Sequence, residues 1–166
     1  MRNIFSRCLL ALYFLLLIWL VLFKLKFNIS SVLNYQQRSL NLIPFGAPSI
    51  INGRIIYGEM ILNCIFFIPL GLLLNVNFKN VGVLFKVAFL LVFSLAVELI
   101  QYIFAIGATD ITDVITNTIG GFLGLKLYDL INRYVHNERL DAVIISVGSV
   151  LLVLFIYIRV NYIMLK

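Results

Sequence analysis

Charged residues are scarce in this chain of 166 residues, where they occupy 12% of the positions while hydrophobic residues occupy 63%. The mean hydropathy of +1.08 agrees with that balance. A water-soluble domain of this size would aggregate with so few charges on its surface. The composition therefore excludes a water-soluble globular protein and indicates that lipid is the solvent for most of the chain.

Cysteine and histidine are also rare. Cys8 and Cys64 both lie in apolar runs without a CxxC motif, which argues against a disulfide framework, a zinc site or a redox pair. The single histidine, His136, lies in a polar loop, where a solvated side chain is favoured over a catalytic one. We expect no metal and no cofactor. The net charge of +6 indicates basic residues at membrane edges rather than a nucleic-acid partner.

Apolar segments long enough to cross a hydrocarbon core of about 30 Å, which takes ~20 helical residues, recur along the chain. Lys24 and Lys26 follow the first of them in place of a small-residue cleavage site, so we expect it to remain as an anchor. The later connections are short, which favours antiparallel neighbours in a bundle. The sequence predicts an all-α, multi-pass protein of the cell membrane, a compact bundle of about five transmembrane helices at 8–23, 56–74, 81–104, 111–131 and 143–164.

A polar stretch separates the first two expected helices and ends in Pro44-Phe45-Gly46-Ala47-Pro48, a pattern that cannot continue a helix. Such long loops are usually functional or mobile. The turn at 105–109 has no Lys or Arg, whereas the turns on either side of it in sequence carry several. The positive-inside bias therefore favours a cytoplasmic N-terminus and an external C-terminus, although the basic residues divide seven to six between the two sides.

Acidic and amide side chains gather near the start of the second helix, the end of the third and the start of the fourth. Alternating helix directions place these ends, and the long loop, on one side of the membrane, which is extracellular in the favoured orientation. The candidate binding residues are Arg38, Asn41, Glu59, Asn63, Glu98, Gln101, Asp110, Asp113 and Asn117, and the catalytic candidates among them are Glu98, Asp110 and Asp113. Asp129, Glu138 and Asp141 lie at the end of the fourth helix and in the following loop, where water can solvate them.

The position of Glu98 favours a functional role for this residue over a structural one. It lies toward a helix C-terminus, where the helix dipole disfavours an anion and no capping role exists. Burying its charge in lipid costs ~2.5–3.5 kcal/mol on insertion scales. We expect it to face the bundle interior, either protonated or paired with Arg38 or Arg54.

For the other polar positions, structural and functional roles are equally weighted. Asp110 and Asp113 occupy the positions of a helix N-cap and its third-position partner, where carboxylates satisfy free N–H groups. Asn63, Gln101 and Asn117 could serve as interhelical hydrogen-bonding residues, worth ~0.6 kcal/mol each.

Two packing features accompany the polar residues. Gly120 and Gly124 form a GxxxG pattern, which allows a neighbouring backbone to approach closely. Pro69 lies within the second expected helix and suggests a kink or a break there.

Four motif segments resemble the VanZ-like family, and the resemblance covers nearly the full length as a single domain over residues 1–166. The segments are Arg38-Ser39-Leu40-Asn41-Leu42-Ile43-Pro44-Phe45, Phe67-Ile68-Pro69-Leu70-Gly71-Leu72 with Asn63 before it, Glu98-Leu99-Ile100-Gln101, and Gly107-Ala108-Thr109-Asp110-Ile111-Thr112-Asp113-Val114-Ile115-Thr116-Asn117-Thr118-Ile119-Gly120-Gly121. The last segment is the most specific. The resemblance implies low-level resistance to teicoplanin and related lipid-tailed glycopeptides, acquired without an altered peptidoglycan terminus, and it implies no settled reaction.

The chain departs from the family pattern in two places. Many relatives place an arginine shortly before the first aspartate of the last segment, and positions 105–109 have none. Any role of that arginine cannot be carried over, so Arg38 or Arg54 would have to supply a counter-charge. The stretch from Pro48 to Gly58 also looks longer than in the family.

Three functional hypotheses follow. In the first, a non-enzymatic membrane factor binds membrane lipid, a lipid-linked cell-wall precursor or the lipoglycopeptide drug in an extracellular-side polar pocket. In the second, an intramembrane enzyme modifies a lipid-linked envelope substrate with carboxylate acid and base groups. The third, a transporter, is disfavoured because about five helices without inverted repeats lack the usual symmetry. The ligand, the reaction and the formation of a homo-oligomer stay open.

Overall fold

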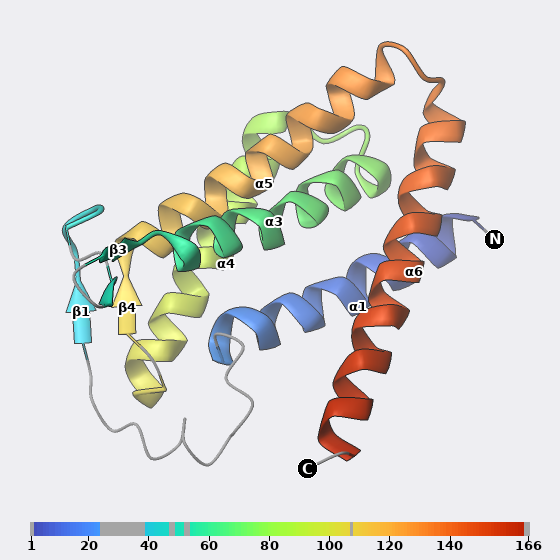
Figure 1. Cartoon of the computed structure of the whole chain (residues 1–166). Coiled ribbons are helices and arrows are strands. Elements are labelled where there is room, and N and C mark those ends of the chain that lie inside the picture. Colours follow the sequence, from blue (N-terminus) through green and yellow to red (C-terminus); the bar gives the residue numbers. More distant parts are fainter. Residues whose placement is uncertain (1, 24–38, 47–48, 52–53, 107, 165–166) are drawn as a thin grey trace.

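The computed structural model describes residues 2–23, 39–46, 49–51, 54–106 and 108–164, and it is essentially all-α, as predicted. Four of the helices in this part of the chain are long and apolar enough to cross a membrane. Both ends of the three middle helices lie within three residues of prediction, whereas the first and last helices end where predicted but begin six residues earlier. The helices are α1 (Arg2–Phe23), α3 (Gly58–Asn77), α4 (Val83–Phe104), α5 (Ile111–Asn132) and α6 (Asn137–Met164) (Figure 1).

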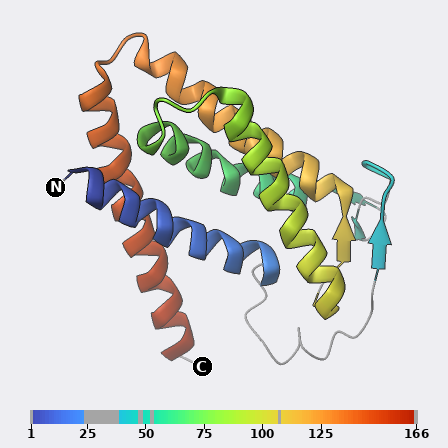
Figure 2. The same cartoon turned by 180° about the vertical axis from the view of Figure 1, so that it is seen from behind.

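The helix α5 buries several polar residues close together near its start. Thr112, Asp113, Thr116 and Asn117 are all buried in its first two turns. It lies alongside α3 over most of its length and also packs against α4, as both views of the chain show (Figures 1 and 2). These neighbours shield polar side chains that lipid would reject.

Glycines bring the backbones of α3 and α5 into direct contact. A Cβ atom added at Gly124 would lie 2.1 Å from the carbonyl oxygen of Ile68, and one at Gly120 would lie 2.1 Å from that of Cys64. The close approach predicted from the GxxxG pattern is therefore confirmed. The break suggested at Pro69 is not observed, because α3 continues through this residue.

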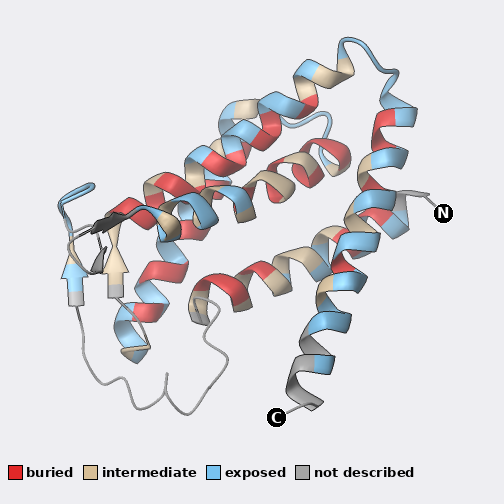
Figure 3. Ribbon diagram, viewed as in Figure 1, coloured by how far each residue is buried: buried red, intermediate tan, exposed pale blue. Residues whose placement is uncertain are grey.

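The core lies where α1, α3, α4 and α5 meet, around the fully buried side chains of Leu17, Phe67, Leu90 and Leu125. A second cluster joins α6 to the bundle through residues that include Leu140 and Ile145. Beyond its first turns α6 is largely exposed within this chain, as the pale blue segments show (Figure 3). In a membrane, that surface faces hydrocarbon.

Two short pairs of strands, which the sequence did not predict, occupy one end of the bundle. The strand β1 (Ser39–Asn41) pairs in parallel with β4 (Ala108–Asp110). The strand β2 (Ser49–Ile51) forms an antiparallel pair with β3 (Arg54–Ile56). The start of α3, the end of α4 and the start of α5 lie at this same end, as alternating helix directions require (Figure 1).

Candidate functional site

The candidate site is built where α4 ends and α5 begins. Ala105 ends α4 in the left-handed conformation, with a φ of 53°. That conformation is uncommon for a residue with a side chain. It lets the Ile106 N–H return to the carbonyl of Gln101, at 3.2 Å. The chain then reverses into β4, and Asp110 both ends this strand and begins α5.

Glu98 connects the two helices across this reversal. Its side chain is 3% exposed, and its Oε2 atom accepts a hydrogen bond of 3.0 Å from the backbone N–H of Asp110. The Thr109 hydroxyl donates to the backbone carbonyl of Glu98 at 3.2 Å. Glu98 therefore faces the bundle interior, as expected, and its carboxyl group holds the start of α5 in place.

The segment that contains β1 is fixed over the start of α5. The Asn41 amide donates to Oδ2 of Asp110 at 3.1 Å, and the backbone N–H of Phe45 donates to the Thr112 hydroxyl at 3.0 Å. Asn41 also accepts from the backbone N–H of Ile43 at 3.1 Å. Asn41 and Asp110 are 69 positions apart in the sequence, and their hydrogen bond joins the two segments into one unit around Asp110.

Asp110 is the N-cap of α5, because its Oδ1 atom accepts from the backbone N–H of Thr112 at 2.8 Å. Asp113 lies in the first helical turn and is 4% exposed. The N-cap role weighed from the sequence is therefore present for Asp110. It uses one oxygen of Asp110, while the other oxygen accepts from Asn41.

Two buried amides connect helices instead of joining the carboxyl groups in one cluster. The Asn117 amide donates to the Ser94 hydroxyl at 2.8 Å, which links α5 to α4. The Gln101 amide donates to the carbonyl of Val21 at 3.0 Å, near the end of α1, where helical carbonyls lack partners within the helix. No described residue donates to the buried Oδ1 of Asn117 or Oε1 of Gln101.

The remaining predicted residues are not brought into this hydrogen-bonded group. Glu59 is exposed on the first turn of α3. Asn63 is half-buried, and its amide nitrogen has no hydrogen-bond acceptor among the described residues. The predicted counter-charges, Arg38 and the side chain of Arg54, lie outside what the structure describes. Of the predicted set, Asn41, Glu98 and Asp110 are directly joined by hydrogen bonds in the described part of the chain.

A cavity of about 290 Å³ opens beside this group. The residues with polar groups that line it are Glu98, Tyr102, Thr109 and Asp110. No lysine, arginine or histidine is among its described lining residues. Within the described residues, no three His, Cys, Asp or Glu side chains gather as metal ligands. The apolar walls are Leu40, Leu42, Leu95, Leu99, Ile111 and Val114. The arrangement combines hydrogen-bond acceptors with an apolar wall.

A second polar network, which sequence reasoning missed, lies near the opposite ends of the same helices. Lys86 of α4 is 6% exposed, and its ammonium group donates to Oδ1 of Asn75 at 2.6 Å. The Asn75 amide donates to Oδ1 of Asp129 at 3.1 Å and to the carbonyl of Leu125 at 3.0 Å. The available signal was the position of Lys86 one turn inside an apolar helix, close to the polar residues in the last turn of α3.

The expectation that water solvates Asp141 is wrong. This side chain is 5% exposed, and it accepts from the Tyr128 hydroxyl at 2.7 Å while forming an ion pair with Lys79. The reason is that α6 begins at Asn137, six residues earlier than predicted, which places Asp141 on the helix face that packs against α5. Glu138, in the first turn of α6, is exposed as expected.

Comparisons with known proteins agree with the geometry of a membrane bundle. A family model described as VanZ/LLP1 matches residues 10–132. Protein VanZ from Enterococcus faecium is 63% identical over 167 aligned residues, which cover 98% of this chain and 100% of that protein. No solved structure matches the chain.

Proposed function

Because the chain belongs to the VanZ/LLP1 family, as the resemblance of its motifs predicted, we propose that it confers low-level resistance to teicoplanin and related lipid-tailed glycopeptides. It acts in the cell membrane, where the cavity beside Glu98 and Asp110 binds the headgroup of a membrane lipid or of a lipid-linked cell-wall precursor. In the proposed orientation this cavity opens toward the outer leaflet. Resistance then results from reduced anchoring of the drug or reduced access to its target.

The observation that carries the proposal is the shared position of two carboxyl groups at one cavity. Glu98 and Asp110 both line it, and they come from different helices that a hydrogen bond holds together. Buried ionisable groups within membrane bundles are costly and usually serve a function. Leu95, Leu99 and Val114 supply an apolar wall against which a lipid chain can lie.

The lining also indicates the chemistry of the ligand. Carboxyl groups accept hydrogen bonds, and Glu98 and Asp110 both line the cavity. These groups complement an amine, hydroxyl or amide-bearing headgroup. The volume lies at the lower end of the ~300–1,000 Å³ range of ligand pockets, which suits a headgroup and part of a chain rather than a whole glycopeptide.

The same pair of carboxyl groups supports a second candidate function, an intramembrane enzyme. Two carboxyl groups in different surroundings can divide the roles of acid and base, because burial favours the protonated form of one of them. Glu98 is the more buried of the two and would be the acid. Mass spectrometry of lipid extracts from expressing and non-expressing cells separates the candidates, because only the enzyme creates or removes a lipid species.

Isosteric amide variants test the proposed function. Glu98→Gln and Asp110→Asn keep the acceptors for the backbone N–H groups of Asp110 and Thr112 while removing the charge. Losing a charge-assisted bond weakens headgroup binding by about tenfold or more. We expect both variants to lower the teicoplanin concentration that the cells tolerate, at unchanged protein level in the membrane.

The matched control is Glu138→Gln, which changes an exposed carboxylate at the start of α6. This variant should retain full resistance. Full resistance in both Glu98→Gln and Asp110→Asn, at normal expression, would contradict a role for the cavity.

A further inference from the structure

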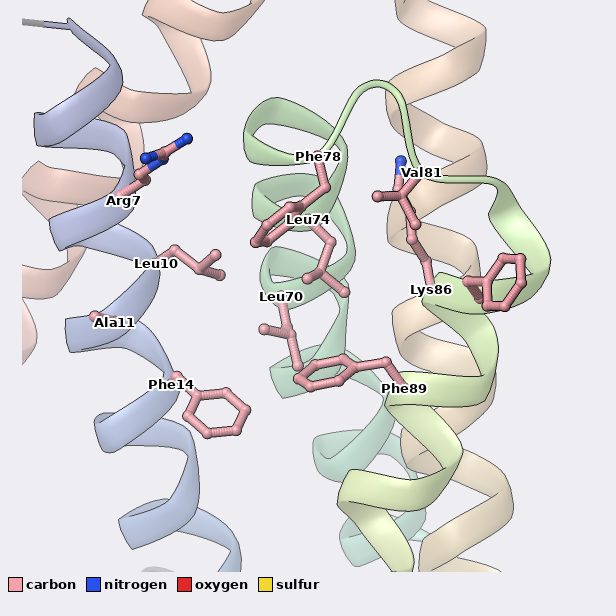
Figure 4. Close-up of a pocket in the computed structure, with 11 residues that line it drawn as sticks. Arg7, Leu10, Ala11, Phe14, Leu70, Leu74, Phe78, Val81, Lys86 and Phe89 are labelled. Atoms are coloured by element: carbon pink, nitrogen blue, oxygen red, sulfur yellow. The ribbon is translucent and has the colours of Figure 1, made fainter.

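A second and larger cavity, of about 530 Å³, lies between α1 and the facing surfaces of α3 and α4 (Figure 4). On α1 its lining is spaced as one helical face, at Arg7, Leu10, Ala11 and Phe14. Leu70 and Leu74 of α3 lie one turn apart on the opposite wall. All three helices are long and apolar enough to span a membrane, so the cavity lies at membrane depth.

Aromatic rings bound one end of the cavity. Phe14 packs against Phe93 with 4.5 Å between ring centroids and against Phe89 with 6.0 Å, so these rings join α1 to α4. From there the lining continues to Phe78 and Val81 at the α3–α4 connection and to Arg7 near the start of α1 (Figure 4). A chain could therefore enter from the membrane surface nearest Arg7 and end against the aromatic rings.

The charged residues that line this cavity, among those that the structure describes, have one sign. They are Arg7 and Lys86, and no described carboxyl group lines the cavity. The ammonium group of Lys86 is directed to Asn75, in the network that includes Asp129. Arg7 is exposed near the start of α1, and no carboxylate in the described part of the chain forms an ion pair with it. This lining complements an anionic headgroup that carries an apolar chain.

We infer that this cavity is a binding site for an anionic phospholipid of the leaflet nearest the start of α1. One acyl chain lies between α1, α3 and α4, and the phosphate lies against the guanidinium of Arg7. The site is separate from the cavity beside Glu98 and Asp110, whose lining has the opposite charge character and lies at the other end of α4. Either site can be present without the other.

The chemistry of the cavity favours a phospholipid over other occupants. Apart from Arg7 and Lys86 its lining is aliphatic and aromatic, so a glycopeptide core would lose hydrogen bonds to water without replacing them. A second copy of the chain would have to insert side chains between two helices that the aromatic rings already join. A flexible acyl chain enters such a space at about 0.8 kcal/mol gained for each buried methylene.

Native mass spectrometry of the full-length protein in detergent tests the inference, with phosphatidylglycerol and phosphatidylcholine of identical chains as probes. We expect wild-type protein to bind phosphatidylglycerol about fivefold more tightly, since one basic residue near a headgroup is worth about that factor. Arg7→Gln should remove the preference, whereas Arg7→Lys should retain it. Ala11→Phe, which extends a ring into the cavity from an exposed position, should reduce binding of both lipids.

The control is Arg133→Gln, an exposed arginine that follows α5 and does not line the cavity. It should leave both affinities unchanged. Equal binding of the two lipids to wild-type protein, or unchanged binding in Ala11→Phe, would overturn the inference. So would a dimer that Ala11→Phe dissociates, or a preference for teicoplanin over phosphatidylglycerol. If Ala11→Phe protein does not fold, the charge variants Arg7→Gln and Arg7→Lys decide the matter alone.

Discussion

The backbone N–H of Asp110 donates a 3.0 Å hydrogen bond to the side chain of Glu98, so the buried carboxyl group of α4 holds the N-cap residue of α5. Asn41 binds the side chain of the same aspartate from β1. Three segments that are distant in sequence therefore meet at one residue. Both candidate functions of the cavity beside Glu98 and Asp110 depend on this local geometry.

Replacing Glu98 by alanine should destabilise the protein, whereas replacing it by glutamine should not. Alanine leaves the Asp110 N–H without its acceptor in a buried position, which costs about 1–3 kcal/mol. Glutamine retains an acceptor oxygen. Unfolding in detergent by denaturant titration measures the difference, and equal loss of stability in both variants would show that charge, rather than the hydrogen bond, supports the fold.

Gly124→Ala should strongly destabilise the contact between α3 and α5. Its Cβ would lie 2.1 Å from the carbonyl oxygen of Ile68, so the two backbones must separate. Overpacking of this kind costs about 1–3 kcal/mol or more. Gly148→Ala is the matched control, because its Cβ would be in ordinary contact, 3.4 Å from a Leu9 methyl. The control should gain stability, since alanine favours a helix by up to about 1 kcal/mol. Thermal unfolding of purified protein compares the two.

Lys86→Met should lower stability by about 1–3 kcal/mol, because it leaves Oδ1 of Asn75 buried without its donor. Lys126→Met is the control on an exposed position, where only the contact with the Phe122 ring is lost, worth about 0.5–1 kcal/mol. In a double variant with Asn75→Leu, the losses should be less than additive if the two residues interact directly. Additive losses would contradict the buried bond.

Tyr128→Phe should cost about 1 kcal/mol of stability by removing the donor to Asp141. The same change at Tyr134, which is 85% exposed, should have almost no effect. Denaturant titration of both variants checks this prediction. Equal effects would show that the buried hydroxyl of Tyr128 contributes nothing to the attachment of α6.

The helices could be predicted because apolar runs of spanning length are a strong signal. The start of α6 was missed because its first turns, including Glu138 and Asp141, are polar and fall outside such a run. Acidic residues at a helix N-terminus are favourable, so a polar start is compatible with a helix. The same error explains why Asp141 was expected in water, although it is buried.

The site could be predicted only in part. Helix alternation correctly placed Asn41, Glu98 and Asp110 at one end of the bundle, where they bond to one another. It could not show that Gln101 turns to the end of α1, because this depends on helix rotation. The pairing of β1 with β4 was invisible for another reason, since three-residue strands 69 positions apart leave no periodic pattern.

The buried polar side chains of α5 also affect the insertion of this helix into the membrane. A helix whose first turns present Asp113 and Asn117 to its neighbours gains little by entering the bilayer alone. Its packing partners are α3, which its glycines contact closely, and α4, which supplies the Ser94 hydroxyl. We therefore expect α5 to become stable in the membrane only after α3 and α4 have been inserted.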